Sequence, residues 1–135
     1  MLGLDLGERR IGVAISTPEG GLAVPLRVLE SAGDDADARA IAELARAEGV
    51  EALVVGHPLS LDGTAGAQAQ RVEAFARLLE RETGLPVSLW DERLTSKQAE
   101  RAPAGTRPSR RRAPADDVAA AIILQAYLDR QRPDA

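Results

Sequence analysis

The first sixteen residues constrain the fold of this chain more than any other stretch. Residues 2–6 alternate leucine with glycine or aspartate, and residues 11–16 alternate isoleucine or valine with small residues. Alternation with a period of two predicts two strands, each with one apolar face. A short turn-like segment, Gly7-Glu8-Arg9-Arg10, separates the two runs. The two strands are therefore expected to pair antiparallel as a hairpin.

Asp5 lies in the middle of the first predicted strand, on the face opposite the three leucines. Aspartate is disfavoured in strands, and burial of an unpaired carboxylate is costly. A metal ion or a hydrogen-bonded phosphate beside Asp5 would offset that cost. The alternative interpretation is an aspartate that caps a backbone turn.

Length and composition limit the classes of protein to consider. At 135 residues without cysteine, the chain is expected to form a single domain, residues 1–135, that has neither disulfides nor thiolate zinc sites. No apolar run approaches the roughly twenty residues that span a bilayer, and the first residues do not resemble a signal peptide. We therefore expect a cytoplasmic protein without a membrane partner. The net charge of −4 argues against a general nucleic-acid coat protein.

The remaining segments alternate between strand and helix patterns. Strands are predicted at 23–29, 51–55 and 86–90, and helices at 34–48, 67–83 and 116–130, with a short helix capped by Thr95 or Ser96. Pro25 indicates that the third strand lies at an edge of the sheet, and the acidic residues 34–37 are expected to cap the first helix. The order predicts an α/β fold, a mixed five-stranded sheet in which the first three strands are antiparallel and the later ones parallel, with helices on both faces.

Residues 102–115 are rich in proline, alanine and arginine and show no periodicity, which predicts a mobile basic loop. Five arginines lie in or beside it: Arg101, Arg107, Arg110, Arg111 and Arg112. Such a loop would hold a polyanion by its phosphates, or would simply be a solvated surface. Because aromatic residues are few, base stacking is expected to contribute little to recognition.

Three acidic positions are expected at the edge where the parallel strands end: Asp5, the pair Asp91-Glu92 and the pair Asp116-Asp117. Carboxylates that meet repel one another unless a cation lies among them, and a set of oxygen ligands suits Mg²⁺ or Mn²⁺. Such ions support hydrolysis of phosphodiesters. The alternatives are that Asp116 and Asp117 cap a helix and that Glu92 pairs with Arg93 in a turn.

Two further residues are open to two interpretations each. His57 is the only histidine, which excludes a metal site built from several histidines, and it is either a hydrogen-bonded loop residue or a general acid. Asp62-Gly63-Thr64 indicates a turn, although its amides and the Thr64 hydroxyl could also hold a phosphate.

Four blocks of the sequence resemble the YqgF (RuvX) family, in the family's order: LDLGERRIGVA, VVGHPLSLDGT, DERLTS and DDVAAAIILQAYLD. The resemblance implies an RNase H-like fold related to Holliday-junction resolvases, and a nuclease that matures the 5′ end of pre-16S ribosomal RNA. It places the catalytic, metal-binding acids at Asp5, Glu92 and Asp116, with Asp117 as the fallback. The implied cofactor is Mg²⁺ or Mn²⁺.

The resolvase relatives have an acid at the end of the fourth strand, where this chain has Val55-Gly56-His57. A residue of the fifth strand would lie roughly 10 Å from the first strand if the fourth intervenes. A long glutamate side chain at position 92 would span part of that gap. The candidate contacts to nucleic acid are Arg9, Arg10, His57, Thr64, Arg93, Arg110, Arg111 and Arg112.

Competing functions remain open at this point. The substrate is expected to be structured RNA, or alternatively branched DNA; a junction-resolving endonuclease would favour a symmetric homodimer, for which the sequence shows no face. An actin-like ATPase also has an Asp-x-Gly hairpin, but it needs two such domains. A non-catalytic RNA-binding assembly factor on the same scaffold is the alternative of another class.

Overall fold

The hairpin expected at the start of the chain forms in the computed structural model, which describes residues 1–19, 21–94 and 115–131. Strand β1 (Leu2–Leu6) pairs antiparallel with β2 (Arg10–Ser16), and Asp5 lies opposite Gly12 in their register. The alternation of side chains puts the leucines of β1 on one face and Asp5 on the other.

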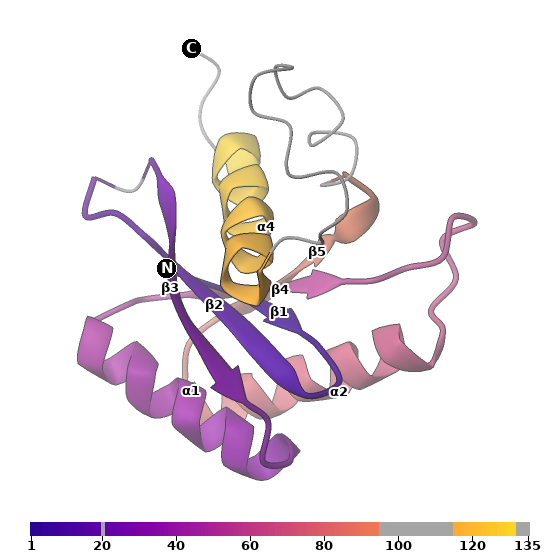
Figure 1. Cartoon of the computed structure of the whole chain (residues 1–135), viewed down its shortest axis with the longest axis horizontal. Helices are drawn as coiled ribbons and strands as arrows, with labels where there is room; N and C mark the ends of the chain where they lie inside the picture. The colour runs from indigo at the N-terminus through magenta and orange to yellow at the C-terminus, as the bar shows by residue number, and fades with distance from the viewer. Residues whose placement is uncertain (20, 95–114, 132–135) are drawn as a thin grey trace.

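Three more strands complete a five-stranded sheet in the order β3-β2-β1-β4-β5 (Figure 1). Strand β3 (Ala23–Glu30) is antiparallel to β2, whereas β4 (Leu53–His57) and β5 (Val87–Asp91) run parallel to β1. The predicted mixed sheet is therefore confirmed. Strand β3 lies at an edge, as Pro25 indicated, and β4 begins and ends two residues later than the pattern predicted.

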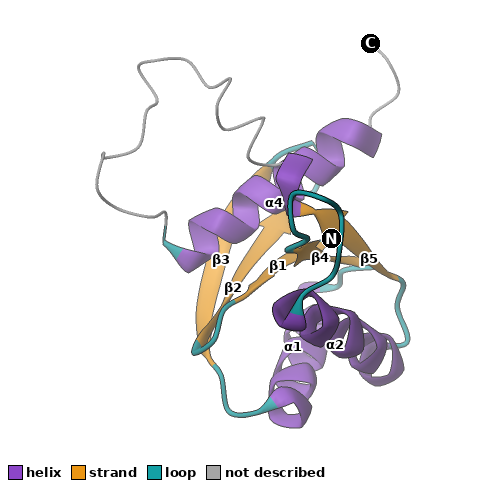
Figure 2. Ribbon diagram, turned by 90° about the vertical axis from the view of Figure 1, so that its right-hand side faces the viewer, coloured by secondary structure: helices purple, strands orange, loops and turns teal. Residues whose placement is uncertain are grey.

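Helices cover both faces of the sheet (Figure 2). Helices α1 (Asp34–Glu48) and α2 (Ala67–Thr83) pack side by side on one face, and α4 (Asp116–Gln131) lies on the other. Both α1 and α2 end at a glycine in the left-handed conformation, Gly49 and Gly84, where a residue with a side chain would be strained.

The start of α1 differs from the sequence prediction. Its N-cap is Gly33, and no acidic side chain caps the helix. Instead Asp37, buried within the first turn, accepts hydrogen bonds from the Ser31 hydroxyl (2.5 Å) and the Ala32 amide (2.8 Å). These bonds tie the incoming chain to the helix, because a carboxylate in the first turn can reach back to preceding donors.

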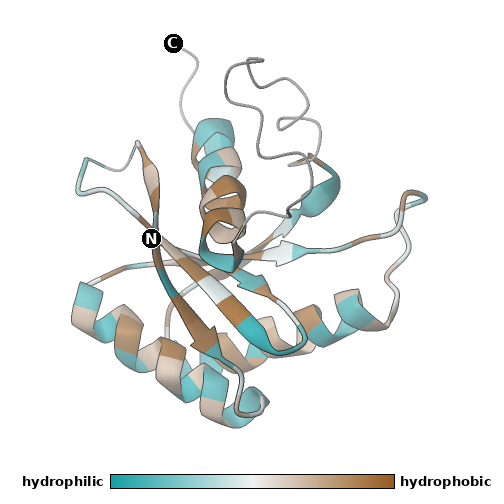
Figure 3. Cartoon of the chain, in the orientation of Figure 1, coloured by the Kyte–Doolittle hydropathy of each residue, from teal (hydrophilic) through white to brown (hydrophobic). Residues whose placement is uncertain are grey.

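Two apolar clusters, one on each side of the sheet, hold the layers together. Figure 3 shows the apolar stretches of the strands and helices. The larger one combines the leucines of β1 with aliphatic residues of α1 and α2 and with Phe75. The smaller one lies under α4 and is built from small and medium-sized residues, namely Ala14, Val54, Trp90, Ala120, Ala121, Ile123, Leu124 and Ala126. Because many of these side chains are alanines, α4 can lie close to the strands.

Two glycines bring α4 into direct contact with the hairpin. A Cβ atom added at Gly3 would lie 2.6 Å from the Leu124 Cβ, and one added at Gly12 would lie 1.8 Å from the carbonyl oxygen of Asp116. The first residue of α4 therefore rests on the backbone of β2, next to the strand that carries Asp5.

Some predictions fall outside the described residues. These include the basic loop at 102–115 and the short helix capped by Thr95 or Ser96, although residues 92–94 already take a helical conformation directly after β5. Among the described helices, none combines the length and the apolar character needed to cross a bilayer.

Candidate active site

Asp5 lies between two glycines of the neighbouring strands. Gly12 of β2 is its register partner on one side. On the other side β1 pairs with β4 up to Leu4 and Val55, so the next position along β4 is Gly56. Because neither neighbour has a side chain, space is left on this face of the sheet on both sides of the Asp5 carboxylate.

Glu92 extends over Gly56 toward Asp5. A Cβ atom added at Gly56 would lie 2.7 Å from Glu92 Oε2 and 2.7 Å from Ile123 Cδ1, so the carboxylate rests on the backbone of β4 beneath α4. Glu92 thus covers part of the gap of about two strand spacings, roughly 10 Å, between β5 and β1, because its side chain lies over the intervening strand β4 at a residue without a side chain.

Asp116 comes to the same place from α4. Its carbonyl oxygen lies over Gly12, and its carboxylate Oδ2 forms an ion pair with Arg10 Nε at a distance of 3.1 Å. The neighbouring Asp117 instead accepts a hydrogen bond from the Val118 amide at 2.9 Å. Of the two acids that open α4, Asp116 is therefore the one whose carboxylate is directed toward the hairpin.

The surroundings of Asp5 and Glu92 disfavour the ionised form of both carboxyl groups. Burial raises the pKa of Asp5, and the charge of Asp116 raises it further. Burial, followed by the charge of Asp5, raises the pKa of Glu92 to about 7. Within the described part of the chain, neither carboxylate accepts a hydrogen bond. The interpretation of Asp5 as a turn cap therefore has no support in the described contacts.

A cation would relieve this repulsion. Residues 1–19, 21–94 and 115–131 contain no group of three histidine, aspartate or glutamate side chains already close enough to hold a metal ion. The chemistry of the side chains nevertheless fits Mg²⁺ or Mn²⁺, because Asp5, Glu92 and Asp116 offer only carboxylate oxygens, and the first two accept no hydrogen bond from the residues that the structure describes.

The raised pKa of Glu92 predicts how the stability of the metal-free protein depends on pH. The ordinary pKa of a glutamate is 4.5, whereas Glu92 has a pKa of about 7 in the fold. Between these values the folded state keeps a proton that the unfolded chain has lost, so the free energy of unfolding falls as the pH rises. Glu92→Gln removes this dependence, and at pH 8 it should stabilise the protein by about 2 kcal/mol after allowance for partial exposure.

Urea denaturation of wild type and Glu92→Gln in EDTA, at pH 4.5 and pH 8, measures this difference. The two proteins should have similar stability at pH 4.5 and diverge at pH 8. Equal stability at both pH values would show that the charge of Glu92 is not destabilising in the fold.

Because side chains alternate along a strand, His57 of β4 and Asp91 of β5 lie on the face of the sheet that α1 and α2 cover, opposite to the face that carries Asp5. Asp91 and His57 are register partners. His57 Nε2 lies 2.8 Å from Glu73 Oε2 on α2, so His57 is a hydrogen-bonded residue on the α2 side, as one of the two interpretations held. The side chain of Asp91 is engaged by Arg93, with N–O distances of 2.6 to 3.0 Å. The alternative that Glu92 pairs with Arg93 is wrong, because the partner of Arg93 is Asp91.

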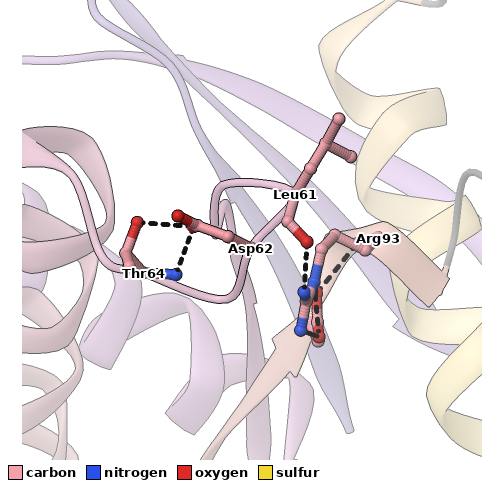
Figure 4. Close-up of polar contacts among 5 residues, drawn as sticks. Leu61, Asp62, Thr64 and Arg93 are labelled. Carbon is pink, nitrogen blue, oxygen red and sulfur yellow. Dashed lines mark hydrogen bonds and ion pairs between the residues drawn. The ribbon is translucent and has the colours of Figure 1, made fainter.

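Arg93 also connects the end of β5 to the loop that follows β4 (Figure 4). Its Nη1 donates to the Leu61 carbonyl at 3.1 Å. In the same loop, the amide and the hydroxyl of Thr64 both donate to Asp62 Oδ1, at 3.0 and 2.8 Å, and Gly63 has φ of 87°. The turn interpretation of Asp62-Gly63-Thr64 is therefore confirmed, with both Thr64 donors used inside the turn.

The remaining nucleic-acid candidates are distributed unevenly. Arg9 and Arg10 are exposed at the turn of the hairpin, and Arg10 contacts Asp116 at the start of α4. Arg110, Arg111 and Arg112 lie outside the described residues. Sequence reasoning missed Gly12 and Gly56 as parts of the site; the signal was a glycine inside each of two strands, which often marks a close approach of another group.

The sheet order, the two helices on one face and the single described helix on the other are those of an RNase H-like fold. A solved structure with this fold is that of Thermus thermophilus RuvC in complex with a Holliday junction substrate, with a TM-score of 0.60 and 17% sequence identity over 93% of this chain and 89% of that one. At this identity the likeness shows the fold alone.

The family follows from the sequence. The profile of the family RuvX, described as Holliday junction resolvase, matches residues 1–130, and the chain belongs to this family. A protein of Moorella thermoacetica is 48% identical over 96% of this chain and 94% of its own, and one of Syntrophus aciditrophicus is 47% identical over 96% and 87%; both bear the name pre-16S rRNA nuclease. The resemblance seen in the sequence is thereby confirmed, and the chain is a nuclease, a hydrolase of phosphodiester bonds.

Proposed function

We propose that this nuclease is metal-dependent and processes the 5′ end of pre-16S ribosomal RNA, using Asp5, Glu92 and Asp116 to hold one or two Mg²⁺ or Mn²⁺ ions. The observation that carries the metal site is the approach of Glu92 to Asp5 over Gly56, where two partly buried carboxylates have no hydrogen-bond donor among residues 1–19, 21–94 and 115–131. Such an arrangement is costly unless a cation binds there.

Each of the three proposed metal ligands is held by a different element of the fold. Asp5 is held by the centre of the sheet, Glu92 by the turn after β5, and Asp116 by the first turn of α4. When bound, the metal would activate water and stabilise the attacking and leaving oxygens. The exposed side chain of Arg10 lies beside Asp116, where it would position the phosphate backbone, and the adjacent Arg9 is also exposed.

The substrate is inferred from the relatives. Two proteins that are nearly half identical to this one over most of their length carry the name of a pre-16S rRNA nuclease. RuvC, seen with a Holliday junction, is much more distant in sequence. Ribosomal precursor RNA is therefore the first choice and a four-way DNA junction the second, and a ribosomal substrate would place the protein in the cytoplasm.

A cleavage assay with both substrates tests the proposal. Purified protein is incubated with labelled pre-16S fragments that keep their 5′ extension, and with four-way DNA junctions, in Mn²⁺ and in EDTA. We expect cleavage of the RNA at the mature 5′ end in Mn²⁺ and none in EDTA. Cleavage of the junction alone would favour the DNA alternative, and tight RNA binding without cleavage would favour the non-catalytic assembly factor.

Gly56→Ala is a prediction for the same site. The new methyl group would occupy the space of the Glu92 carboxylate, which is the end of a flexible side chain and can turn away, but it would also lie 2.7 Å from Ile123 Cδ1. We expect cleavage to fall by about tenfold to a hundredfold and the free energy of unfolding to change by about 1 kcal/mol. Steady-state kinetics and urea denaturation provide the two readouts. Full activity would show that Glu92 does not need its place over β4.

A further inference from the structure

We propose that Arg10 occupies the place of the cation at Asp116 in the metal-free protein, and that metal binding releases Arg10 to hold a phosphate of the substrate. The inference rests on the metal site of the proposed function. It concerns which cation pairs with the Asp116 carboxylate before and after metal binding, and it gives Arg10 a positioning role.

The contact itself is specific and easily broken. Arg10 is the first residue of β2, and its Nε lies 3.1 Å from Asp116 Oδ2. The two side chains are 63% and 36% exposed, respectively. An ion pair this open to solvent contributes little to stability, so a divalent ion can compete with Arg10 for the carboxylate.

The backbone of Asp116 does not need to move for this exchange. Its carbonyl oxygen rests on Gly12, the register partner of Asp5, so the residue is already next to Asp5. Yet the described residues contain no ready set of three ligands. A rotation of the Asp116 side chain away from Arg10 and toward Asp5 would supply the missing oxygen.

The released guanidinium would be well placed for the substrate. Arg10 stays at the rim of the sheet beside the metal, and its planar fork of donors matches a phosphate as well as it matches a carboxylate. Metal and Arg10 share one carboxylate, so binding of the metal and exposure of the Arg10 donors are linked. By the reciprocity of linked equilibria, substrate that takes Arg10 should also strengthen metal binding.

Arg9 provides a matched control, because it is the adjacent exposed arginine and its side chain forms no ion pair within the described ranges. Arg10→Gln and Arg9→Gln change the net charge equally. Mn²⁺ affinity is measured by electron paramagnetic resonance without nucleic acid. We expect Arg10→Gln to bind Mn²⁺ up to about fivefold more tightly than Arg9→Gln does. Equal affinities of the two variants would overturn the inference.

A second measurement follows Arg10 directly. The Arg10 Nε–H resonance, assigned by its absence in Arg10→Gln, is monitored while Mg²⁺ is added to the wild-type protein. The inference predicts a shift that saturates together with metal binding, whereas a resonance unchanged at saturating Mg²⁺ would contradict it. If the wild type binds no Mn²⁺ at all, the metal site of the proposed function fails and this inference with it; binding without release of Arg10 refutes the inference alone.

Discussion

Asp5→Asn is expected to lower the rate of RNA cleavage by about a thousandfold or more, because in the proposed site the metal would lose its most rigidly held ligand and several kcal/mol of transition-state stabilisation with it. The same substitution should stabilise the metal-free protein at neutral pH. Burial and the charge of Asp116 both disfavour the ionised form of Asp5, and an amide removes that penalty. Single-turnover cleavage in Mn²⁺ and thermal denaturation in EDTA measure the two effects.

Asp117→Asn is the matched control for this experiment. Asp117 follows Asp116, but its carboxylate accepts the Val118 amide instead of facing the hairpin. Its substitution should leave the cleavage rate within about threefold, the effect expected of a surface change outside the site. A loss at Asp117→Asn as large as that at Asp5→Asn would make Asp117 the acid of α4. Full cleavage by Asp5→Asn would mean that the reaction takes place elsewhere or belongs to a contaminant.

Gly12→Ala is expected to have the largest structural effect of any single methyl group in the site. The added Cβ would lie 1.8 Å from the carbonyl oxygen of Asp116 and 2.9 Å from the Asp117 amide nitrogen. Both are backbone atoms, so the start of α4 must move away from the sheet. We expect a loss of about 3 kcal/mol in the free energy of unfolding, together with loss of Mn²⁺ binding because Asp116 moves with the helix.

Gly66→Ala is the control. Gly66 is the N-cap of α2, it has an ordinary extended conformation (φ −75°), and a Cβ atom there meets no atom within 4 Å. Its substitution should cost less than about 1 kcal/mol and leave Mn²⁺ affinity unchanged. If Gly12→Ala proved as stable as Gly66→Ala, the close contact between α4 and β2 would be incorrect, and with it the position of Asp116.

Most of the fold could be predicted because its patterns are local. The alternation in residues 2–6 and 11–16 gave the hairpin, and the helix over 67–83 matched its predicted bounds because an apolar stripe ends at a glycine. The cap of α1 could not be predicted in the same way. Several acids stood near its start, and the bonds of Asp37 to Ser31 and Ala32 depend on how the incoming chain turns.

The sequence was enough to propose residues for the candidate site, but not to predict how they are arranged. The end of β5 has two adjacent acids, and pattern alone did not show which one pairs with Arg93. The two acids differ because consecutive side chains lie on opposite faces of the sheet. Asp91 is directed to the α2 side with His57, where it pairs with Arg93, whereas Glu92 is directed to the α4 side. How Glu92 approaches Asp5 depends on Gly56, whose importance becomes visible only once β4 is known to lie between them.

The central claim is that Asp5, Glu92 and Asp116 meet around a divalent ion. Crystals grown with Mn²⁺ and measured for anomalous scattering test it most directly, because the peak locates the metal independently of any assay. The account predicts a peak over the sheet between Asp5 and Glu92, with Asp116 turned from Arg10 to the ion. A peak elsewhere, or an empty site at millimolar Mn²⁺ with these three carboxylates apart, would contradict it.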